Sequence, residues 1–538
     1  MTWVERVFGL FLILPIVGLL DDALGRYSNA SWMAGLERLV YEPAMAQSFV
    51  LSFWVASISL FISLYIAQAV SEKIVLSEDA TLWRSLLLAM PHSALAIGLL
   101  LALSSGGVAW RWLSLGFGFP VDLQYLFPRD PWGLGAILSL VIKESAFLIA
   151  IAIPIAKRLP LRAYESIARQ SGMTHTQCHH QLIWPQVVRS LGPALFVVFV
   201  FGLTNLEVSL ILGPDQPQLI GVRLFQLLTD PDALNRQAGS IGLLVLLLVL
   251  ILIWLGFQMA SRHTRIKNQI PVHIPLHRIV DVIKPMLTMM TWLSIVSLLL
   301  WSVTLRWSVL DPLPTMSFEV LNRLIPLGSP MMMSLIIGLC TSVLAVSVAI
   351  LILEHLMKSG RRRLHWIWWA FLWMPALPMA SGLLAWVYVI GAKPGILAVI
   401  VGHTLIALPY VMIVVSDTWF DRDTRHDMIL GQAGLSMIQR LFYVWIPRHS
   451  RLLIIASAVA FAVSCALYTQ TVLLGGGRVG TLMTELMATI GSERRGSALT
   501  GIINLVLPLG AFLIALGVNR SLWKQRLGMQ GKGYADFR

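Results

Sequence analysis

One spaced pattern of chemically distinctive residues occurs twice in this chain: an acid, a glycine seven residues later and a proline thirteen residues after the glycine. The first copy is Glu165, Gly172 and Pro185, and the second is Asp427, Gly434 and Pro447. Glycine readily adopts the left-handed conformation that ends a helix, whereas for other residues this conformation is less stable by about 1 to 2 kcal/mol. Each copy therefore predicts two short helices joined by a bend at the glycine, the second helix ending at the proline.

The similarity extends beyond these three positions. Residues 163–185 and 425–447 align without gaps, with glutamines identical at two further positions. Thr174 and Ser436 each stand two residues after the glycine, where their side chains can cap the second helix. An ordinary helical hairpin that only closes the inner end of a bundle is one interpretation. The repetition of the pattern in equivalent loops favours a functional one.

A second group of residues places polar or charged chemistry inside apolar runs. Its members are Lys143, Glu144, Asn205, Glu207, Tyr468 and Gln470. A charged side chain facing lipid is unfavourable by a few kcal/mol, so we expect these residues to face the interior of the protein. They are candidates for a translocation pathway, where Glu207 would favour a cationic solute. The alternative is a structural role, such as a counter-ion pair between Lys143 and Glu207.

Two further kinds of chemistry receive little support. The cluster His175, Cys178, His179 and His180 resembles a metal site in composition only, because adjacent histidines on a short helix point in different directions and no second ligand pair is nearby in sequence. We therefore expect no metal. The chain also has no G-x4-GK[ST] loop, and the fragment Gly531-Lys532-Gly533 lacks its upstream glycine and hydroxyl. We expect neither a cofactor in this chain nor an enzyme that hydrolyses ATP by itself.

The elements that must position these residues are apolar segments of membrane-spanning length. The chain has 538 residues, 57% of them hydrophobic and only 12% charged, which excludes a soluble enzyme. About 20 apolar residues are needed to cross a bilayer. Twelve segments qualify: 4–20, 46–70, 84–105, 134–156, 191–213, 239–260, 286–305, 331–353, 366–390, 395–416, 451–474 and 498–518.

The net charge of +13 reports membrane topology. With the N-terminus in the cytoplasm, the loops on the inner side carry the excess of Lys and Arg, as the positive-inside rule requires. Nucleic acid is not needed to explain the charge. A signal peptide is the alternative for the first segment, but Asp21 and Asp22 stand where small residues would mark cleavage. We expect a multi-pass protein of the bacterial inner membrane with both termini in the cytoplasm.

The two halves of the chain follow one plan. Met90-Pro91 with Gly98-Leu99-Leu100 in the first half matches Met374-Pro375 with Gly382-Leu383-Leu384 in the second, at identical spacing. We predict an all-α integral membrane protein with about twelve transmembrane helices in two parallel six-helix repeats. The predicted parts are a first domain at 1–262, a cytoplasmic linker at 263–284, a second domain at 285–520 and a cytoplasmic tail at 521–538. Two such halves usually enclose a transport pathway.

The doubled loop pattern resembles the inner-loop signature of permease subunits of binding-protein-dependent ABC importers. That signature reads Glu-Ala-Ala, three residues, Gly, nine residues, Ile-x-Leu-Pro. Glu165, Gly172, Leu182 and Pro185 match it, as do Gly434 and Pro447, whereas Asp427 replaces the glutamate and the alanine pair is absent from both copies. Residues 473–488 resemble the family's outer Gly-Gly-Gly-x3-Thr-Leu segment. The plan of two fused permease domains is similar to that of thiamine and ferric-iron permeases.

The resemblance implies a mechanism in which this chain does no catalysis. Each inner loop would dock as a coupling helix in a groove on a separate ATPase subunit, so one chain would need two copies of that subunit. ATP and Mg would be bound by these partners. A periplasmic or extracellular solute-binding protein would deliver a small polar solute at the outer face, and the permease would carry it across the lipid bilayer.

A secondary transporter, proton-coupled or facilitated, is the main alternative because such proteins also have two six-helix halves. The stretch from Ser359 to Arg363 resembles the tail of the inner-loop motif of major-facilitator transporters. The upstream glycine and aspartate of that motif are missing, and those proteins do not repeat the long loop between the fourth and fifth segments. A membrane-embedded enzyme is disfavoured because acids and histidines are not concentrated at one membrane face.

Overall fold

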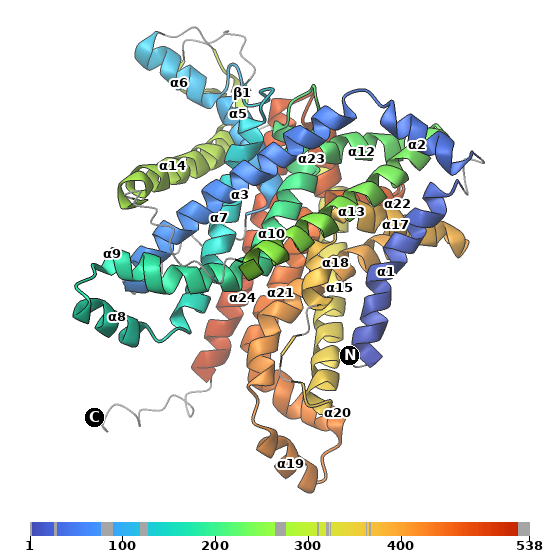
Figure 1. The fold of residues 1–538 in the computed structure, drawn as a ribbon. Coiled ribbons are helices and arrows are strands. Elements are labelled where there is room, and N and C mark those ends of the chain that lie inside the picture. The colour runs from blue at the N-terminus through green and yellow to red at the C-terminus, as the bar shows by residue number, and fades with distance from the viewer. Residues whose placement is uncertain are drawn as a thin grey trace.

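A computed structural model describes residues 3–25, 30–76, 90–118, 127–263, 276–308, 311–318, 322, 324–361, 363–364 and 367–525. Within these ranges the protein is almost wholly helical (Figure 1). Among the described residues, ten helices are long and apolar enough to cross a membrane, and two more apolar helices are shorter. The predicted all-α membrane fold is confirmed, whereas the count of twelve spans stays a prediction.

The first half of the chain contains the helices up to α13. Their bounds are α1 (Trp3–Ala23), α2 (Trp32–Val40), α3 (Met45–Leu76), α5 (His92–Leu103), α6 (Val108–Phe117), α7 (Leu134–Lys157), α8 (Leu161–Gln170), α9 (His175–Cys178), the π-helical turn η1 (His179–Ile183), α10 (Trp184–Thr204), α11 (Glu207–Leu212), α12 (Ile220–Thr229) and α13 (Ala233–His263).

The second half repeats this order with few differences. Its elements are α14 (Leu276–Val303), the short strands β1 (Thr304–Arg306) and β2 (Thr315–Met316), α15 (Leu324–Lys358), α16 (Ile367–Trp373), α17 (Ala376–Val389), α18 (Ile396–Phe420), α19 (Thr424–Gln432), α20 (Met437–Arg440), the π-helical turn η4 (Leu441–Trp445), α21 (Ile446–Ala466), α22 (Tyr468–Gly475), α23 (Leu482–Thr489) and α24 (Arg494–Gln525). The strands pair antiparallel.

Three of the twelve predicted segments are not single helices, which corrects the sequence interpretation. Segment 191–213 breaks between α10 and α11, segment 451–474 breaks between α21 and α22, and segment 366–390 breaks at Pro375. Asn205 and Leu467 leave the helical conformation, with ψ of 124° and 99°. Hydropathy alone cannot show such breaks, because the residues on both sides are apolar.

Two of the breaks have local features that can be named. The Asn205 side-chain oxygen accepts a hydrogen bond from the backbone N–H of Val208, in the first turn of α11, at 2.6 Å. Pro375 is extended, with ψ of 151°, and it has no N–H to continue the preceding helix. Pro91 has the same conformation before α5. The part of segment 84–105 before residue 90 lies outside the described residues.

The first helix of each half packs on the other half. α1 lies against α17, and α14 lies against α5. In each contact a glycine lets the two helices approach closely. A Cβ atom on Gly382 would overlap the Pro15 carbonyl oxygen, and one on Gly98 would overlap Oγ of Ser294. Ser294 also donates a hydrogen bond to the Leu95 carbonyl at 3.1 Å. These two glycines are the pair that the sequence comparison of the halves matched.

The predicted linker and tail are only partly described. Helix α14 begins at Leu276, inside the stretch assigned to the linker at 263–284, and the linker bounds stay a prediction. Residues 264–275 lie outside the described part of the chain, as do residues 526–538 of the predicted tail, which include the Gly531-Lys532-Gly533 fragment.

Candidate functional site

The two copies of the acid, glycine and proline pattern form two helical hairpins of the same design. One consists of α8 and α9, and the other of α19 and α20. Gly172 and Gly434 stand at the bends with φ of 66° and 79°, so the predicted left-handed conformation is confirmed at both. A Cβ atom at either glycine would meet no atom within 4 Å, so it is the backbone conformation, not lack of space, that favours glycine there.

The second helix of each hairpin starts with a capping box, as the hydroxyl residues predicted. Thr174 accepts from the backbone N–H of Gln177 at 3.2 Å, and the Gln177 side chain accepts from the Thr174 N–H at 2.8 Å. Ser436 and Gln439 make the same pair of bonds at 3.3 and 2.8 Å. This pair of identical glutamines therefore has a structural reason, because each reciprocates the cap.

The prolines do not end the second helix, which corrects the prediction. Pro185 and Pro447 each occupy the second position of a long helix that continues to residue 204 or 466. The π-helical turns η1 and η4 come directly before these helices. A wider turn makes room for a residue without an N–H, and proline is tolerated in the first turn of a helix. Each hairpin is thus continuous with a membrane-spanning helix.

Both hairpins project from the helical bundle. Figure 1 shows α19 and α20 at the bottom and α8 and α9 at the left, whereas α6 lies at the top. Gly172, Pro185 and Gly434 are exposed, while Glu165 and Pro447 are half-buried. Asp427 lies in α19, and its side chain is outside the described part. These positions make the hairpins accessible to a partner.

The second hairpin exposes apolar side chains that the sequence analysis missed. Ile429 is 61% exposed, Ile438 69%, and Tyr443 of η4 74%. In the first hairpin Ile167 of α8 is 48% exposed. Exposed apolar residues on a segment that projects from a helical bundle are typical of a docking surface. The signal was present in the sequence as apolar residues on a loop between two spans.

Polar residues predicted for the pathway divide into two groups in the structure. In α7, Lys143 donates a hydrogen bond to the Met90 carbonyl at 2.5 Å, and Glu144 contacts Nε2 of His92 at 3.1 Å. Both side chains are buried, as their charge requires. These contacts fix the start of α5 against α7.

The second group lies where the broken helices of the two halves meet. The Glu207 carboxylate is within hydrogen-bonding reach of the backbone of Tyr468 and Thr469, at the start of α22. The Asn205 amide is 3.4 Å from the same carboxylate. The sequence aligns Glu207 with Thr469, and the structure brings these two equivalent positions together. Gln470 is fully buried nearby and donates to the Ala376 carbonyl at 3.1 Å.

Among the polar residues of the bundle that the sequence analysis did not single out are two buried ones and one half-buried one. His403 of α18 contacts Ser464 at 2.8 Å through Nδ1 and Thr471 at 3.1 Å through Nε2. Asn504 of α24 donates to Ser93 of α5 at 3.2 Å, which joins the two halves. His92 is the third. Each is a single neutral polar residue in an apolar segment, a signal too common to select without the fold.

Comparison with known proteins decides the family. No family model matches the chain. The inner membrane ABC transporter permease protein YnjC of Escherichia coli K12 is 30% identical to it over 448 residues, 82% of each chain. The chain belongs to the ABC transporter permeases. The thiamine transport system permease protein ThiP is 26% identical in Salmonella typhimurium over 76% of each chain. The Escherichia coli ThiP is 27% identical over 72% of this chain and 73% of its own length.

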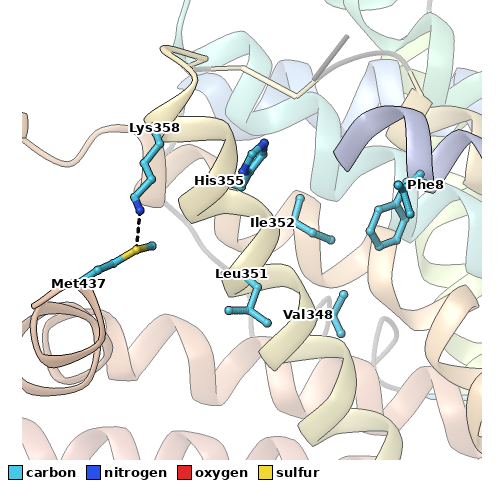
Figure 2. A pocket seen from close by; sticks show the side chains of 8 residues that line it. Phe8, Val348, Leu351, Ile352, His355, Lys358 and Met437 are labelled. Carbon is cyan, nitrogen blue, oxygen red and sulfur yellow. Dashed lines mark hydrogen bonds between the residues drawn. The ribbon is translucent and has the colours of Figure 1, made fainter. Parts of the chain in front are cut away.

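The permease is therefore a multi-pass inner membrane protein and a transport component, as its relatives are. One open groove in the described residues lies away from Glu207 and its neighbours, between α1 and α15 (Figure 2). Phe8, Val348, Leu351 and Ile352 line it, and Lys358 reaches the sulfur of Met437 at its edge. An apolar groove of this kind offers few convergent polar groups for a polar solute.

Proposed function

We propose that this permease is the membrane-spanning subunit of an ATP-driven importer. A solute-binding protein would deliver a small polar solute to its outer face, and separate ATPase subunits would dock on its inner hairpins. Closure of the ATPase subunits around ATP would move both hairpins, and the long helices continuous with them would carry this movement to the place where α11 and α22 meet.

The observation that carries the proposal is the paired hairpin geometry. Both hairpins have a left-handed glycine, a capping box and a continuous connection to a spanning helix, at equivalent positions of the two halves. A hairpin that only closed a bundle would not need the same bend twice. Because one chain carries two hairpins, one copy of the permease with two ATPase subunits is the expected stoichiometry.

The relatives make thiamine the first solute to test. The proteins named thiamine permeases align over most of the chain. Thiamine is a cation, and the half-buried Glu207 carboxylate at the meeting point of α11 and α22 supplies an acid for a cationic solute. An uncharged or anionic solute would leave Glu207 with a structural role only.

The test replaces the two bend glycines and measures coupling. Gly172→Val with Gly434→Val places branched side chains at left-handed positions, which opposes the bend by about 1 to 2 kcal/mol at each site. We expect ATP-dependent uptake in vesicles to fall at least about tenfold, since about 1.4 kcal/mol corresponds to a factor of ten. The ATPase subunit should copurify less well with this variant than with the native permease.

Two control variants separate coupling from general strain. Gly360→Val creates the same strain in another loop, since Gly360 has φ of 73° and open space around it, and uptake should persist. Gly172→Asn with Gly434→Asn should retain most activity because asparagine tolerates this conformation. Unchanged uptake in the double valine variant would refute the coupling role. A permease that purifies alone, with no ATPase and with proton-driven uptake, would favour the secondary transporter.

A further inference from the structure

Three side chains of types that can bind metal ions meet where the first inner hairpin joins the membrane domain. Two of them are buried and one is half-buried. Glu72 comes from the end of α3, and His179 and His180 come from the π-helical turn η1. One ligand atom from each lies within 4.8 Å of the other two. Nε2 of His180 is 3.3 Å from Oε2 of Glu72, which is about the spacing of two ligands on a tetrahedral zinc ion with bonds of about 2.0 to 2.1 Å.

The π-helical turn explains why adjacent histidines converge. In an α-helix consecutive side chains diverge by about 100°, and the wider turn of a π-helix reduces this angle. The two imidazole rings lie with their centroids 5.9 Å apart. The sequence argument against a metal site assumed a regular helix and did not include Glu72, which is far away in the chain.

The hydrogen bonds around His179 leave one ring nitrogen open. Ser71 donates its hydroxyl hydrogen to the Gln68 carbonyl at 2.8 Å, so its oxygen can accept from Nε2–H of His179 at 3.4 Å. That arrangement puts the lone pair on Nδ1, which has no hydrogen-bond partner in the described part of the chain although the residue is only 2% exposed. A metal-bound histidine has this form, with one nitrogen on the metal and the other donating to an oxygen.

His180 has the same division between its two nitrogens. Nδ1 lies 2.9 Å from the Gln68 side-chain amide, while Nε2 faces Glu72 and makes no aligned hydrogen bond within the described residues. The orientation of a glutamine amide is assigned from its surroundings, and with its oxygen toward the ring Gln68 would accept from Nδ1–H. Nε2 is then an available ligand beside the carboxylate.

The second half of the chain has an arginine beside a buried carboxylate, and the first half has no described arginine beside Glu72. In the second half the buried Glu354 of α15 pairs with the guanidinium of Arg422, a permanent cation. The residues of η4 at the positions of His179 and His180 are Leu441 and Phe442. Glu72 is also buried, but the described basic groups beside it are two imidazoles in place of an arginine. A buried carboxylate requires a cation, and a metal ion held by the histidines would supply one.

We propose that Glu72, His179 and His180 bind a divalent transition metal ion of the zinc type, with the fourth position taken by water. Two imidazoles and one carboxylate are ligands that suit such an ion and do not suit magnesium or calcium. The ion would join α3 to the turn between the first hairpin and its spanning helix. This inference does not depend on the proposed importer function.

The test uses the full-length permease purified with a tag that contains no histidine, stripped with a chelator and titrated with Zn²⁺ in a metal-buffered solution. We expect one tight site per chain, and Co²⁺ in its place should give the absorption bands of a tetrahedral site. His179→Leu with His180→Phe copies the residues of the second half and should remove this site. Glu72→Gln, which keeps the shape of the side chain, should weaken binding by at least tenfold.

The exposed His175 on the same loop is the matched control, and His175→Ala should leave binding unchanged. Zn²⁺ should raise the melting temperature of the native permease and of His175→Ala, and that of the Glu72 variant less, which reports binding even if the double variant folds poorly. The proposal is overturned if the Glu72 and histidine variants bind Zn²⁺ as the native protein does. It is also overturned if a protonated histidine alone stabilises the cluster, seen as pH-dependent melting with no effect of metal.

Discussion

At the scale of single residues, the structure contains both a buried ion pair and an exposed one, and we expect only the buried pair to matter much for stability. Glu354 and Arg422 are almost wholly buried, and Arg422 lies over the ring of Trp445 at 4.2 Å. Glu354 also accepts a hydrogen bond from the indole of Trp419 at 3.1 Å. Arg158 and Asp417 form a pair at 2.5 Å whose side chains are 71% and 68% exposed.

Mutation of these two pairs should lower stability by very different amounts. Arg422→Met leaves the Glu354 carboxylate buried without its cation and should lower stability by about 3 to 5 kcal/mol. Arg158→Met removes a solvated pair, which typically contributes less than about 1 kcal/mol. Thermal unfolding in detergent compares the two. Equal melting temperatures for both variants would contradict the prediction, and Glu354→Gln in the Arg422→Met background should restore part of the loss.

Single-residue rules predicted part of the candidate site. The conformations of Gly172 and Gly434 and the caps at Thr174 and Ser436 follow from local chemistry, which a sequence shows directly. The partners of Glu207, by contrast, depend on contacts between residues far apart in the chain. The sequence could place this carboxylate in an apolar segment, but it could not show that α22 lies beside it.

At the scale of elements, close helix crossings depend on two glycines. Gly382 lets α17 contact α1, and Gly98 lets α5 contact α14. Association of helices in lipid relies on this kind of close approach, because water supplies no hydrophobic drive between them. The glycines at matched positions thus have matched structural roles.

We predict that Gly98→Val or Gly382→Val will lower the yield of folded permease sharply. The new side chain would overlap backbone or Ser294, and the helices would have to separate. Gly510→Val in α24 is the control, because nothing lies within 4 Å of a Cβ atom there. Size-exclusion profiles and yield after membrane extraction measure the effect. Similar profiles for all three variants would refute the role of the crossings.

The caps permit a milder test of the hairpins. Thr174→Ala removes the oxygen that accepts from Gln177, and Ser436→Ala does the same in the second hairpin. Loss of such a cap weakens a helix start by about 0.5 to 2 kcal/mol. We expect the hairpins to show faster hydrogen exchange in both variants while the spanning helices are unchanged. Identical exchange in the variants and the native permease would contradict this expectation.

The length of the apolar segments predicted where helices form, but not where these helices are interrupted. All twelve segments lie at least partly on helices, because about 20 apolar residues have few alternatives in a membrane. The breaks at Asn205 and Leu467, and the π-helical turns before Pro185 and Pro447, were not predicted. The break at Asn205 carries a local hydrogen bond and the π-helical turns precede a proline without an N–H, and the neighbouring helices decide what these features do to the chain.

At the scale of the whole molecule, the two halves are interlocked. Because α1 lies on the second half and α14 on the first, neither half buries its own surface alone. One hydrophobic cluster accordingly contains residues of both, such as Leu148 of α7 and Leu486 of α23. The division into domains at 1–262 and 285–520 describes the order of the chain, whereas packing crosses that division.

This interlocking predicts the behaviour of a divided chain. Cutting between residues 264 and 275, before the start of α14, leaves every described helix whole. Coexpressed halves should associate and copurify without the connection, and either half alone should be degraded or aggregate. Affinity purification through a tag on one half measures the association. Recovery of a stable, monodisperse single half would show that the crossings contribute little.

The crossing of α1 onto α17 also sets a delay during synthesis. α1 ends at Ala23, whereas α17 begins only at Ala376, far into the second half. At about 5 to 20 residues per second, the ribosome needs roughly 20 to 70 s to produce the partner of a helix already inserted in the bilayer. α14 has no such delay, because α5 precedes it. Two contacts that are equivalent in the finished protein are therefore formed under different conditions, and insertion factors have a longer opportunity to act on α1 before α17 arrives than on α14.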